Sequence, residues 1–343
     1  VVAFFDEHYN EIDVVTFNLV RYTLPDNEKM SAHMRYAIMR ETGIYDLTKD
    51  ENIFVVQTTM NICIKNRFAE NKHFDETMIS AEDQKYITTN LLDKMKIGYC
   101  REASYNYYKH KGSATSEKLY PQFAYEPEMK YYEWLFSLFE DGQIPKYIQA
   151  LVFYNMIWKN NSNLLYPWHL EGEEYKKEYS RLIKLLNKID TDVIVAHPTL
   201  NNFHKQYFLC LKENNPVYPF VSKRGVFLIN SDNSNVTYFC KKIEIVIKRI
   251  RIKDNRFVFL GHIKSPLFNY LGKPTVVAYE NGKKVDNDID LFLSSFSYYG
   301  CKTKTNNFWA FYYTTPVDSK KSIEFFVNID GMEHRREKWG PMA

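Results

Sequence analysis

The sequence is poor in cysteine and holds no closely spaced cysteine pair. Five cysteines are spread over 343 residues, and none of them forms a CxxC pattern. An odd, widely spaced set argues against both a disulfide framework and a cysteine-based zinc site. The usage favours a reducing compartment, and we expect a cytoplasmic location.

Excess charge and long apolar runs are also missing. The formal net charge is only +3, from 45 Lys and Arg against 42 Asp and Glu, so no nucleic-acid signature is present. No apolar run reaches the length of about 18 residues that a membrane helix needs. The longest run, Tyr147–Trp158, is interrupted by Gln149 and Asn155 and predicts a buried helix. Docking at the inner membrane face, without a spanning helix, stays open.

Aromatic residues, in contrast, are abundant. The chain holds 27 Tyr and 24 Phe, and aromatics make up 16% of it. Aromatic rings can form platforms for sugars or bases, but they also fill ordinary cores. Composition alone favours the core role.

Three regions follow one another along the chain, which is long enough for two or three domains. Helical and β-branched segments alternate up to about residue 116, which predicts an α/β layer structure. We expect a buried strand at Asp13–Leu19, a partly helical segment at Met30–Met39 and one or two strands within Asn52–Lys65. Helical patterns then dominate residues 117–215. Short strand patterns with polar turns fill residues 216–343, among them Arg256–Ile263 and Ile323–Ile329, and predict a β-sandwich. The expected fold is therefore α/β, followed by an all-α connector and an all-β sandwich-like domain.

The first region contains the most informative stretch, His73–Tyr86, which reads HFDETMISAEDQKY. Ile87, Leu91 and Met95 follow at helical spacing and predict a helix that begins near Glu82 and Asp83. Ser80 is a good N-cap residue, and Asp83 stands three residues later, as in a capping box. A carboxylate in a first helical turn is favoured by the helix dipole and the free N–H groups. Spacing alone favours the capping role over a catalytic one.

The surrounding residues change this reading. The pattern FDE-x(5)-ED, preceded by QTTMNICIKNRF and followed by YNYYKHKGSAT, resembles the acceptor half of a family 2 glycosyltransferase catalytic domain of the GT-A type. The resemblance implies that Glu82 and Asp83 match the family's acidic pair. Asp83 then stands where the family has its general base, which takes the proton from the acceptor hydroxyl as it attacks the sugar. Transfer in this family implies inversion at the anomeric carbon.

A basic loop follows at Tyr107–Ser113 and matches a stretch where the family often has arginines. The resemblance implies that Lys109, His110, Lys111 and Ser113 contact the donor diphosphate or the acceptor. Lysine binds phosphate as a point charge and lacks the two-pronged geometry of arginine. A solvated basic loop is an equally good interpretation. His33, in SAHMRYA, is a further candidate for acceptor or phosphate contact, although a surface histidine is the simpler interpretation.

The chain departs from the family at its beginning. No DxD triplet precedes the acceptor half, and Asp6-Glu7 lies in a predicted helix rather than in a metal loop. The family would supply Mg²⁺ or Mn²⁺ through that triplet, so we assign no metal ligand in this chain. We expect residues 1–116 to be a partial GT-A domain without its donor half, and the chain by itself to transfer no sugar.

The later regions extend the resemblance. GQIPKYIQALVFYNMIWK and SYYGCKTKTNNFWAFYY are similar to the middle of bacterial proteins that join a family 2 glycosyltransferase to a CDP-glycerol:glycerophosphate glycerophosphotransferase. Such proteins build teichoic-acid-like polymers, which implies a nucleotide-sugar donor and a polyol-phosphate or glycan acceptor. The alternative is a non-catalytic module that binds glycan or spaces two enzyme domains. Trp309, Tyr298, Tyr299, Tyr312 and Tyr313 could then form a glycan-binding face, although strand alternation turns some of them inward.

Overall fold

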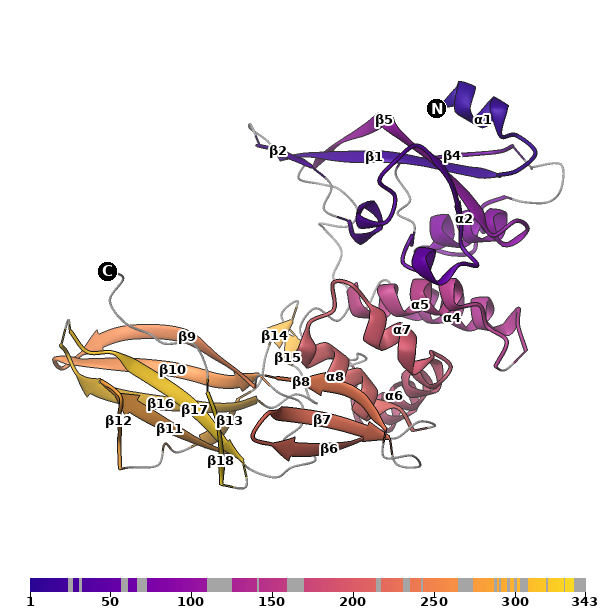
Figure 1. Ribbon diagram of the computed structural model, residues 1–343. Coiled ribbons are helices and arrows are strands. Elements are labelled where there is room, and N and C mark those ends of the chain that lie inside the picture. Colours follow the sequence, from indigo (N-terminus) through magenta and orange to yellow (C-terminus); the bar gives the residue numbers. More distant parts are fainter. Residues whose placement is uncertain are drawn as a thin grey trace. The chain divides into compact units, whose positions relative to one another are not determined.

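The computed structural model divides into two compact units, of residues 1–159 with 188–199 and of residues 160–187 with 200–343 (Figure 1). The structure describes residues 1–23, 27–30, 33–56, 61–66, 73–109, 125–140, 142–158, 170–213, 217–230, 235–241, 243–264, 274–286, 289, 291–294, 297–298, 301–302, 308–318, 320–329 and 331–335. Helices and several sheets are both present, which confirms the expected mixed class in its coarser form. The three domains drawn from the sequence, with boundaries after residues 116 and 215, stay a prediction.

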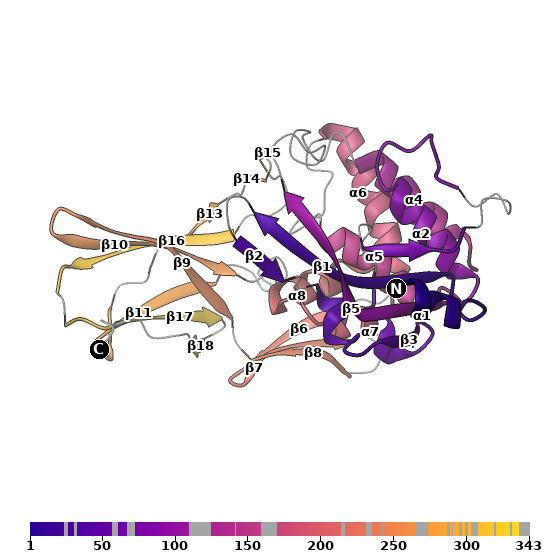
Figure 2. The ribbon, with the colours of Figure 1, turned by 90° about the horizontal axis from the view of Figure 1, so that it is seen from above.

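The first unit is built on a mixed sheet. Its strands are β1 (Val14–Thr23), β2 (Asn27–Met30), β3 (Gly43–Asp46), β4 (Ile62–Ile64) and β5 (Lys96–Lys109). The order is β2-β1-β5-β3, with β4 also paired to β1, and β1 runs parallel to β5 (Figure 2). A parallel pair requires a crossover connection, and the segment between these strands includes α2 (Glu82–Leu92).

The sequence explains the central position of β1. Val14, Val15 and Thr16 have no exposed surface, and Leu19 has 1%. A strand covered on both faces reads as a continuous β-branched run, as here, so the predicted buried strand is confirmed. Helix α1 (Val2–Glu7) begins the chain and contains Asp6-Glu7, as expected from the sequence.

The strand pattern predicted for Asn52–Lys65 is largely wrong. In the described residues only β4 is a strand there, and the one-turn 3-10 helix η2 (Asp50–Asn52) replaces its beginning. Val55 and Val56 are fully buried without belonging to a strand. Buried apolar residues in an irregular segment give the same sequence pattern as a strand.

Helices complete the first unit: α4 (Tyr125–Ser137), α5 (Lys146–Trp158) and α7 (Thr191–Ala196). Because α5 is apolar on nearly all sides, it is buried along most of its length, as predicted. The 3-10 helix η1 (Met34–Ala37) replaces the partly helical segment expected around Met30–Met39. Within the described residues, no helix is long and apolar enough to cross a membrane.

One buried hydroxyl gives a test of this packing. Tyr147 is fully buried on α5, and no hydrogen-bond partner for its Oη lies among the described residues. Replacement by Phe removes an unsatisfied polar atom, so we expect the free energy of unfolding to stay within about 0.5 kcal/mol or to rise. Tyr131→Phe, which breaks the 2.8 Å hydrogen bond between Tyr131 Oη and Thr88 Oγ1, should cost about 1 kcal/mol. Urea unfolding of both variants checks this, and a larger loss for Tyr147→Phe would contradict the described packing.

The second unit begins with α6 (Gly172–Asn187) and α8 (Asn202–Leu211), followed by strands. A three-stranded antiparallel sheet contains β6 (Val217–Ser222), β7 (Gly225–Asn230) and β8 (Val236–Cys240). Two four-stranded sheets come next. The first has the order β13 (Leu291–Ser294), β16 (Phe308–Pro316), β10 (Arg256–Lys264), β9 (Glu244–Lys253). The second has the order β12 (Lys283–Lys284), β11 (Thr275–Glu280), β17 (Ile323–Ile329), β18 (Met332–Arg335). The short strands β14 (Ser297–Tyr298) and β15 (Cys301–Lys302) pair with each other in a separate two-stranded sheet.

The two four-stranded sheets pack through an aromatic core. The ring of Phe325 on β17 lies 5.8 Å from Phe259, 5.2 Å from Phe311 and 5.4 Å from Tyr313, measured between centroids. Gly261 permits this close packing, since a Cβ there would stand 2.4 Å from the Phe311 ring. Tyr313 is 9% exposed and Tyr312 is 54% exposed, so neighbouring tyrosines point to opposite faces, as alternation predicts. Tyr299 and the side chain of Tyr298 lie outside the described residues.

Candidate functional site

The acidic pair lies in the first turn of α2. Glu82 and Asp83 are its first two residues, and both side chains are half-buried. Asp83 Oδ1 accepts a hydrogen bond of 2.7 Å from the backbone N–H of Gln84. The predicted place of Asp83 in a first helical turn is confirmed.

The predicted capping box is wrong. The N-cap is Ala81 rather than Ser80, and no side chain caps the helix. Ala81 adopts a left-handed conformation with φ of 64°, which few residues other than glycine visit readily. The turn at Ala81 moves Ser80 out of the capping position, so the pairing of Ser80 with Asp83 does not account for Asp83.

Helix α5 binds His33 and the start of α2 through consecutive residues. The Tyr154 hydroxyl lies 2.9 Å from His33 Nε2, and Asn155 donates to Gln84 Oε1 at 2.9 Å. His33 is the N-cap of η1, and its Nδ1 accepts from the backbone N–H of Arg35 at 3.3 Å. In the neutral ring the proton is then on Nε2, which donates to Tyr154. Helix α5 thus contacts His33 directly, and it contacts Gln84, the residue that follows Asp83.

A buried network fixes η1, which carries His33. Arg35 has no exposed surface, and its Nη2 donates to Tyr36 Oη and to Asn61 Oδ1, both at 2.9 Å. Tyr36 Oη donates to the Phe17 carbonyl at 3.0 Å, and Thr16 Oγ1 donates to the Asn61 carbonyl at 3.0 Å. The network joins η1 to β1 and to the residue that precedes β4.

Tyr131 of α4 is buried, and its hydroxyl lies 2.8 Å from Thr88 Oγ1 of α2. Burial raises the pKa of its hydroxyl, and the negative charge of Asp83 raises it further. The Asp83 carboxylate therefore acts electrostatically on a buried ring. Electrostatic interactions in such water-poor surroundings are stronger than in bulk water.

An ion pair fixes the acidic loop to α2. Lys85 Nζ lies 2.7 Å from Asp75 Oδ2 and 4.9 Å from the centroid of the Trp134 ring. Asp75 Oδ1 accepts from the Thr77 N–H at 3.1 Å and from Thr77 Oγ1 at 2.6 Å. The hydrogen bond from Lys85, followed by that from Thr77, lowers the pKa of Asp75 to about 2. The sequence interpretation missed Lys85, although acid and base on either side of a predicted helix start were visible.

This pair predicts a pH dependence of stability. Because the folded state lowers the pKa of Asp75 from 3.8 to about 2, the folded state binds fewer protons than the unfolded one. The stabilisation is complete above about pH 5 and is lost as the pH falls toward 2. After a discount for partial exposure we expect Asp75→Asn to cost about 1 kcal/mol at pH 7. The cost should fall to a small fraction of this value near pH 2, where about half of the Asp75 carboxyls are protonated in the folded state. Urea unfolding at both pH values measures it, and an equal cost at both would contradict the assignment.

The predicted basic loop lies almost entirely outside the described residues. This applies to His110, Lys111 and Ser113, and to the side chain of Lys109. The backbone of Lys109 ends β5 and pairs with Thr23 of β1. Tyr108, just before it, is 55% exposed and stacks on Tyr22 with ring centroids 4.8 Å apart. A role of these four residues in donor or acceptor binding stays a prediction.

The described residues contain no group of three or more His, Cys, Asp or Glu that could hold a metal ion. Asp190-Thr191-Asp192 spells a DxD triplet, but later in the chain than the acidic pair. Asp190 Oδ2 accepts from Gln149 Nε2 at 3.0 Å, and Asp192 pairs with Lys146 at 2.7 Å. These contacts give the triplet a structural role.

Comparison with known proteins gives a sequence match. No protein-family model matches the chain. The minor teichoic acid biosynthesis protein GgaB of Bacillus subtilis (strain 168) is 24% identical over 229 residues, which cover 65% of this chain and 25% of that protein. The chain thus spans about a quarter of the length of this curated relative.

Two solved structures of S. aureus TarS are also similar, with scores too low to support an argument about fold. The first covers 97% of this chain and 59% of that chain, at 14% identity and a TM-score of 0.40. The second, of residues 217–571, covers 65% of this chain and 68% of that chain, at 10% identity and a TM-score of 0.25. The match to GgaB confirms the resemblance predicted from the sequence: this chain is similar to a protein of teichoic-acid synthesis, and it resembles family 2 glycosyltransferases.

Proposed function

We propose that this chain is part of a bacterial glycosyltransferase that transfers a sugar from a nucleotide-sugar donor to a teichoic-acid-like polymer. The similarity to a teichoic-acid biosynthesis protein carries the proposal. The position of Asp83 supports it, because a half-buried carboxylate in a first helical turn is suited to accept a proton.

In the proposed reaction Asp83 takes the proton of the acceptor hydroxyl while that oxygen attacks the anomeric carbon. The bond to the nucleoside diphosphate breaks, and a single displacement inverts the configuration. Glu82 would bind an acceptor hydroxyl or orient Asp83. The link from Asn155 to Gln84 supports this role by holding the first turn of α2 in place.

His33 is proposed to contact the acceptor through its fixed ring. Its hydrogen bond with Tyr154 and its half-buried position support a positioned imidazole rather than a freely moving surface histidine. Lys109, His110, Lys111 and Ser113 are proposed to bind the donor diphosphate, as the family resemblance implies. A divalent metal would share that task, but the described residues offer no fitting donor set, so none of these steps is routed through it.

The experiment is a transfer assay with the polypeptide encoded by the whole reading frame that holds this chain. This polypeptide is incubated with a synthetic glycerol phosphate oligomer and each common nucleotide sugar in turn. The mass of the oligomer is then measured by mass spectrometry. We expect one nucleotide sugar to add one or more sugar units. The chain of residues 1–343, assayed in parallel, is expected to add none. Failure of every donor, with ribitol phosphate oligomers also tested, would contradict the proposal.

A further inference from the structure

The strongest concentration of charge lies in the second unit, far along the sequence from Asp83. The nine residues from Lys248 to Arg256 hold five cations and one acid, Asp254, which leaves a net charge of +4 in a chain whose total is +3. They form the end of β9, a turn and the first residue of β10. All nine are exposed.

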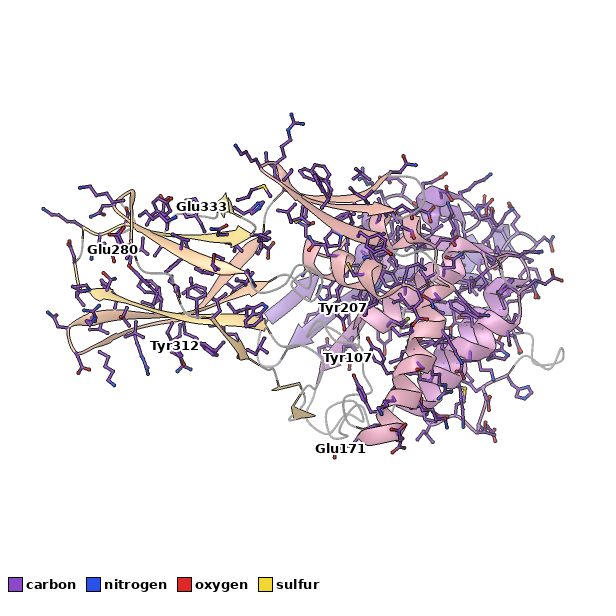
Figure 3. The ribbon with its side chains drawn as sticks, turned by 90° about the horizontal axis from the view of Figure 1, so that it is seen from below. Tyr107, Glu171, Tyr207, Glu280, Tyr312 and Glu333 are labelled. Carbon is purple, nitrogen blue, oxygen red and sulfur yellow. The ribbon has the colours of Figure 1, made fainter. Side chains whose placement is uncertain are left out.

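The strand register places the cations on one side of their sheet. Residues directly opposite on neighbouring strands point to the same face. Successive rows across β9, β10 and β16 are Arg249, Leu260 and Tyr312; Arg251, Val258 and Thr314; Lys253, Arg256 and Pro316. Because Phe259, Phe311 and Tyr313 face the aromatic core, these rows lie on the outer face. Figure 3 shows Tyr312 of β16 and Glu280 of β11 on opposite sides of the two packed four-stranded sheets.

Aromatic rings lie on the same face. Tyr312 is 54% exposed and Phe292 of β13 is 38% exposed. Their rings stack with centroids 5.3 Å apart and an interplanar angle of 17°. Phe292 lies opposite Ala310, two residues before Tyr312, so both rings are on the outer face, and Tyr312 belongs to the row that starts at Arg249. Two large rings therefore form an exposed apolar platform beside a line of cations.

The cations are available for a ligand. Among the described residues, no acidic side chain forms an ion pair with Arg249, Arg251 or Lys253. Arg256 donates its Nη2 to the carbonyl and the hydroxyl of Thr314, at 3.1 and 3.4 Å, which holds its guanidinium over the same face. Side chains two residues apart on a strand stand about 7 Å apart, so Arg249, Arg251 and Lys253 form a regularly spaced line along β9.

Protection of an exposed edge would explain part of this pattern. β9 ends the order of its sheet, and charged residues on edge strands prevent pairing with other chains. That role needs neither a single face for Arg249, Arg251 and Lys253 nor an aromatic pair on the same face. A ligand with regularly spaced negative charges and apolar ring or chain carbons accounts for both.

We propose that this outer face, defined by Arg249, Arg251, Lys253 and Arg256 with the Tyr312 and Phe292 rings, binds the polyol-phosphate polymer that the site at Asp83 would glycosylate. The phosphodiester groups contact the cations, and the sugar or polyol carbons pack on the rings. The identity of the polymer rests on the proposed function, whereas the charge and ring geometry stand independently of it. A nucleic acid is disfavoured because the two rings stack on each other rather than standing apart to receive bases.

The test is binding of a fluorescent glycerol phosphate oligomer to the full chain, followed by anisotropy over a range of salt concentrations. The triple variant Arg249→Ser, Arg251→Ser, Lys253→Ser should bind about tenfold more weakly or worse, and the slope of log affinity against log salt should fall by about 2. The control variant Lys223→Ser, Arg224→Ser, Lys320→Ser removes the same charge from exposed positions elsewhere in this unit. Its affinity should stay within about twofold of the original. Tyr312→Ala should weaken binding about fivefold.

Four results would overturn the proposal: no binding by the unchanged chain at low salt, an equal loss in the control, an unchanged affinity of Tyr312→Ala, or equal affinity for oligothymidylate of the same phosphate number. Equal melting temperatures of the variants exclude misfolding as the cause of a loss. The assay contains no donor, so its outcome is independent of sugar transfer. Binding without transfer would count against the proposed function alone, and transfer without binding would count against this surface alone.

Discussion

Asp83→Asn is expected to lower kcat for sugar transfer about a thousandfold, with the KM for the acceptor changed by less than about threefold. The amide keeps the size of the side chain, and its oxygen can still accept the N–H of Gln84. It cannot take a proton from the acceptor hydroxyl. A loss confined to kcat is therefore the result that separates a base from a residue that only binds or caps. Steady-state transfer by the polypeptide of the whole reading frame measures it.

Glu76→Gln is the matched control, since it changes an exposed carboxylate of the same loop by the same chemistry. Its kcat should stay within about twofold, because Glu76 has no part in the proposed proton transfer. Equal losses in Asp83→Asn and Glu76→Gln would indicate a general effect of charge on the loop. An unchanged kcat in Asp83→Asn would leave Asp83 with its local hydrogen bond alone.

Arg35→Met is expected to lower the free energy of unfolding by about 3 kcal/mol. Met fills much of the space of the Arg stem, so the main loss is electrostatic. The buried oxygens of Asn61 and Tyr36 lose the donors that Arg35 supplies at 2.9 Å. Removing one member of a buried polar network costs more than removing all of it, because the remaining atoms stay without water.

Arg40→Met is the control for Arg35→Met. Arg40 is exposed, and its Nε donates to the Ala37 carbonyl at 3.0 Å, at the end of the same 3-10 helix. We expect this variant to lose less than about 0.5 kcal/mol, as is usual for surface substitutions. Urea unfolding, followed by tryptophan fluorescence, compares the two. A similarly small loss of unfolding free energy in both variants would show that the Arg35 network contributes little to holding η1 and its N-cap His33 in place.

Much of the fold could be predicted where one periodicity continued long enough. β17 was expected at Ile323–Ile329, and its observed bounds are the same. The strand expected at Arg256–Ile263 extends one residue further, as β10. Both have a covered face and a more exposed face, so their alternation is strong. The helix at Lys146–Trp158 was equally clear because its apolar run is long.

Short elements carried too weak a signal. α7 has only six residues and contains the β-branched run Val193–Val195, which does not favour a helix. β6 includes Pro219, a residue that argues against a strand prediction. The strand nevertheless forms, at the edge of its sheet, where it pairs only with β7 among the described strands. Proline is tolerated on such an edge because it has no N–H to donate to a further strand.

The candidate site depended on contacts that no local pattern reveals. The helix start near Asp83 was predictable from Ile87 and Leu91, but the left-handed turn at Ala81 was not, since alanine carries no signal for it. The link from Asn155 to Gln84 joins residues 71 positions apart. In the sequence Asn155 is only an interruption of an apolar run, whereas in the structure its buried amide donates to Gln84 in the first turn of α2.

The central claim is that Asp83 performs the proton transfer, and single-turnover kinetics test it most directly. The polypeptide of the whole reading frame, saturated with glycerol phosphate oligomer, is mixed with less than one equivalent of radiolabelled donor and quenched at intervals. We predict that Asp83→Asn binds the oligomer with unchanged affinity and transfers the sugar at least about five hundredfold more slowly than the Glu76→Gln control, whose own rate stays within about twofold of the original. Transfer by Asp83→Asn at the rate of the control would contradict the claim.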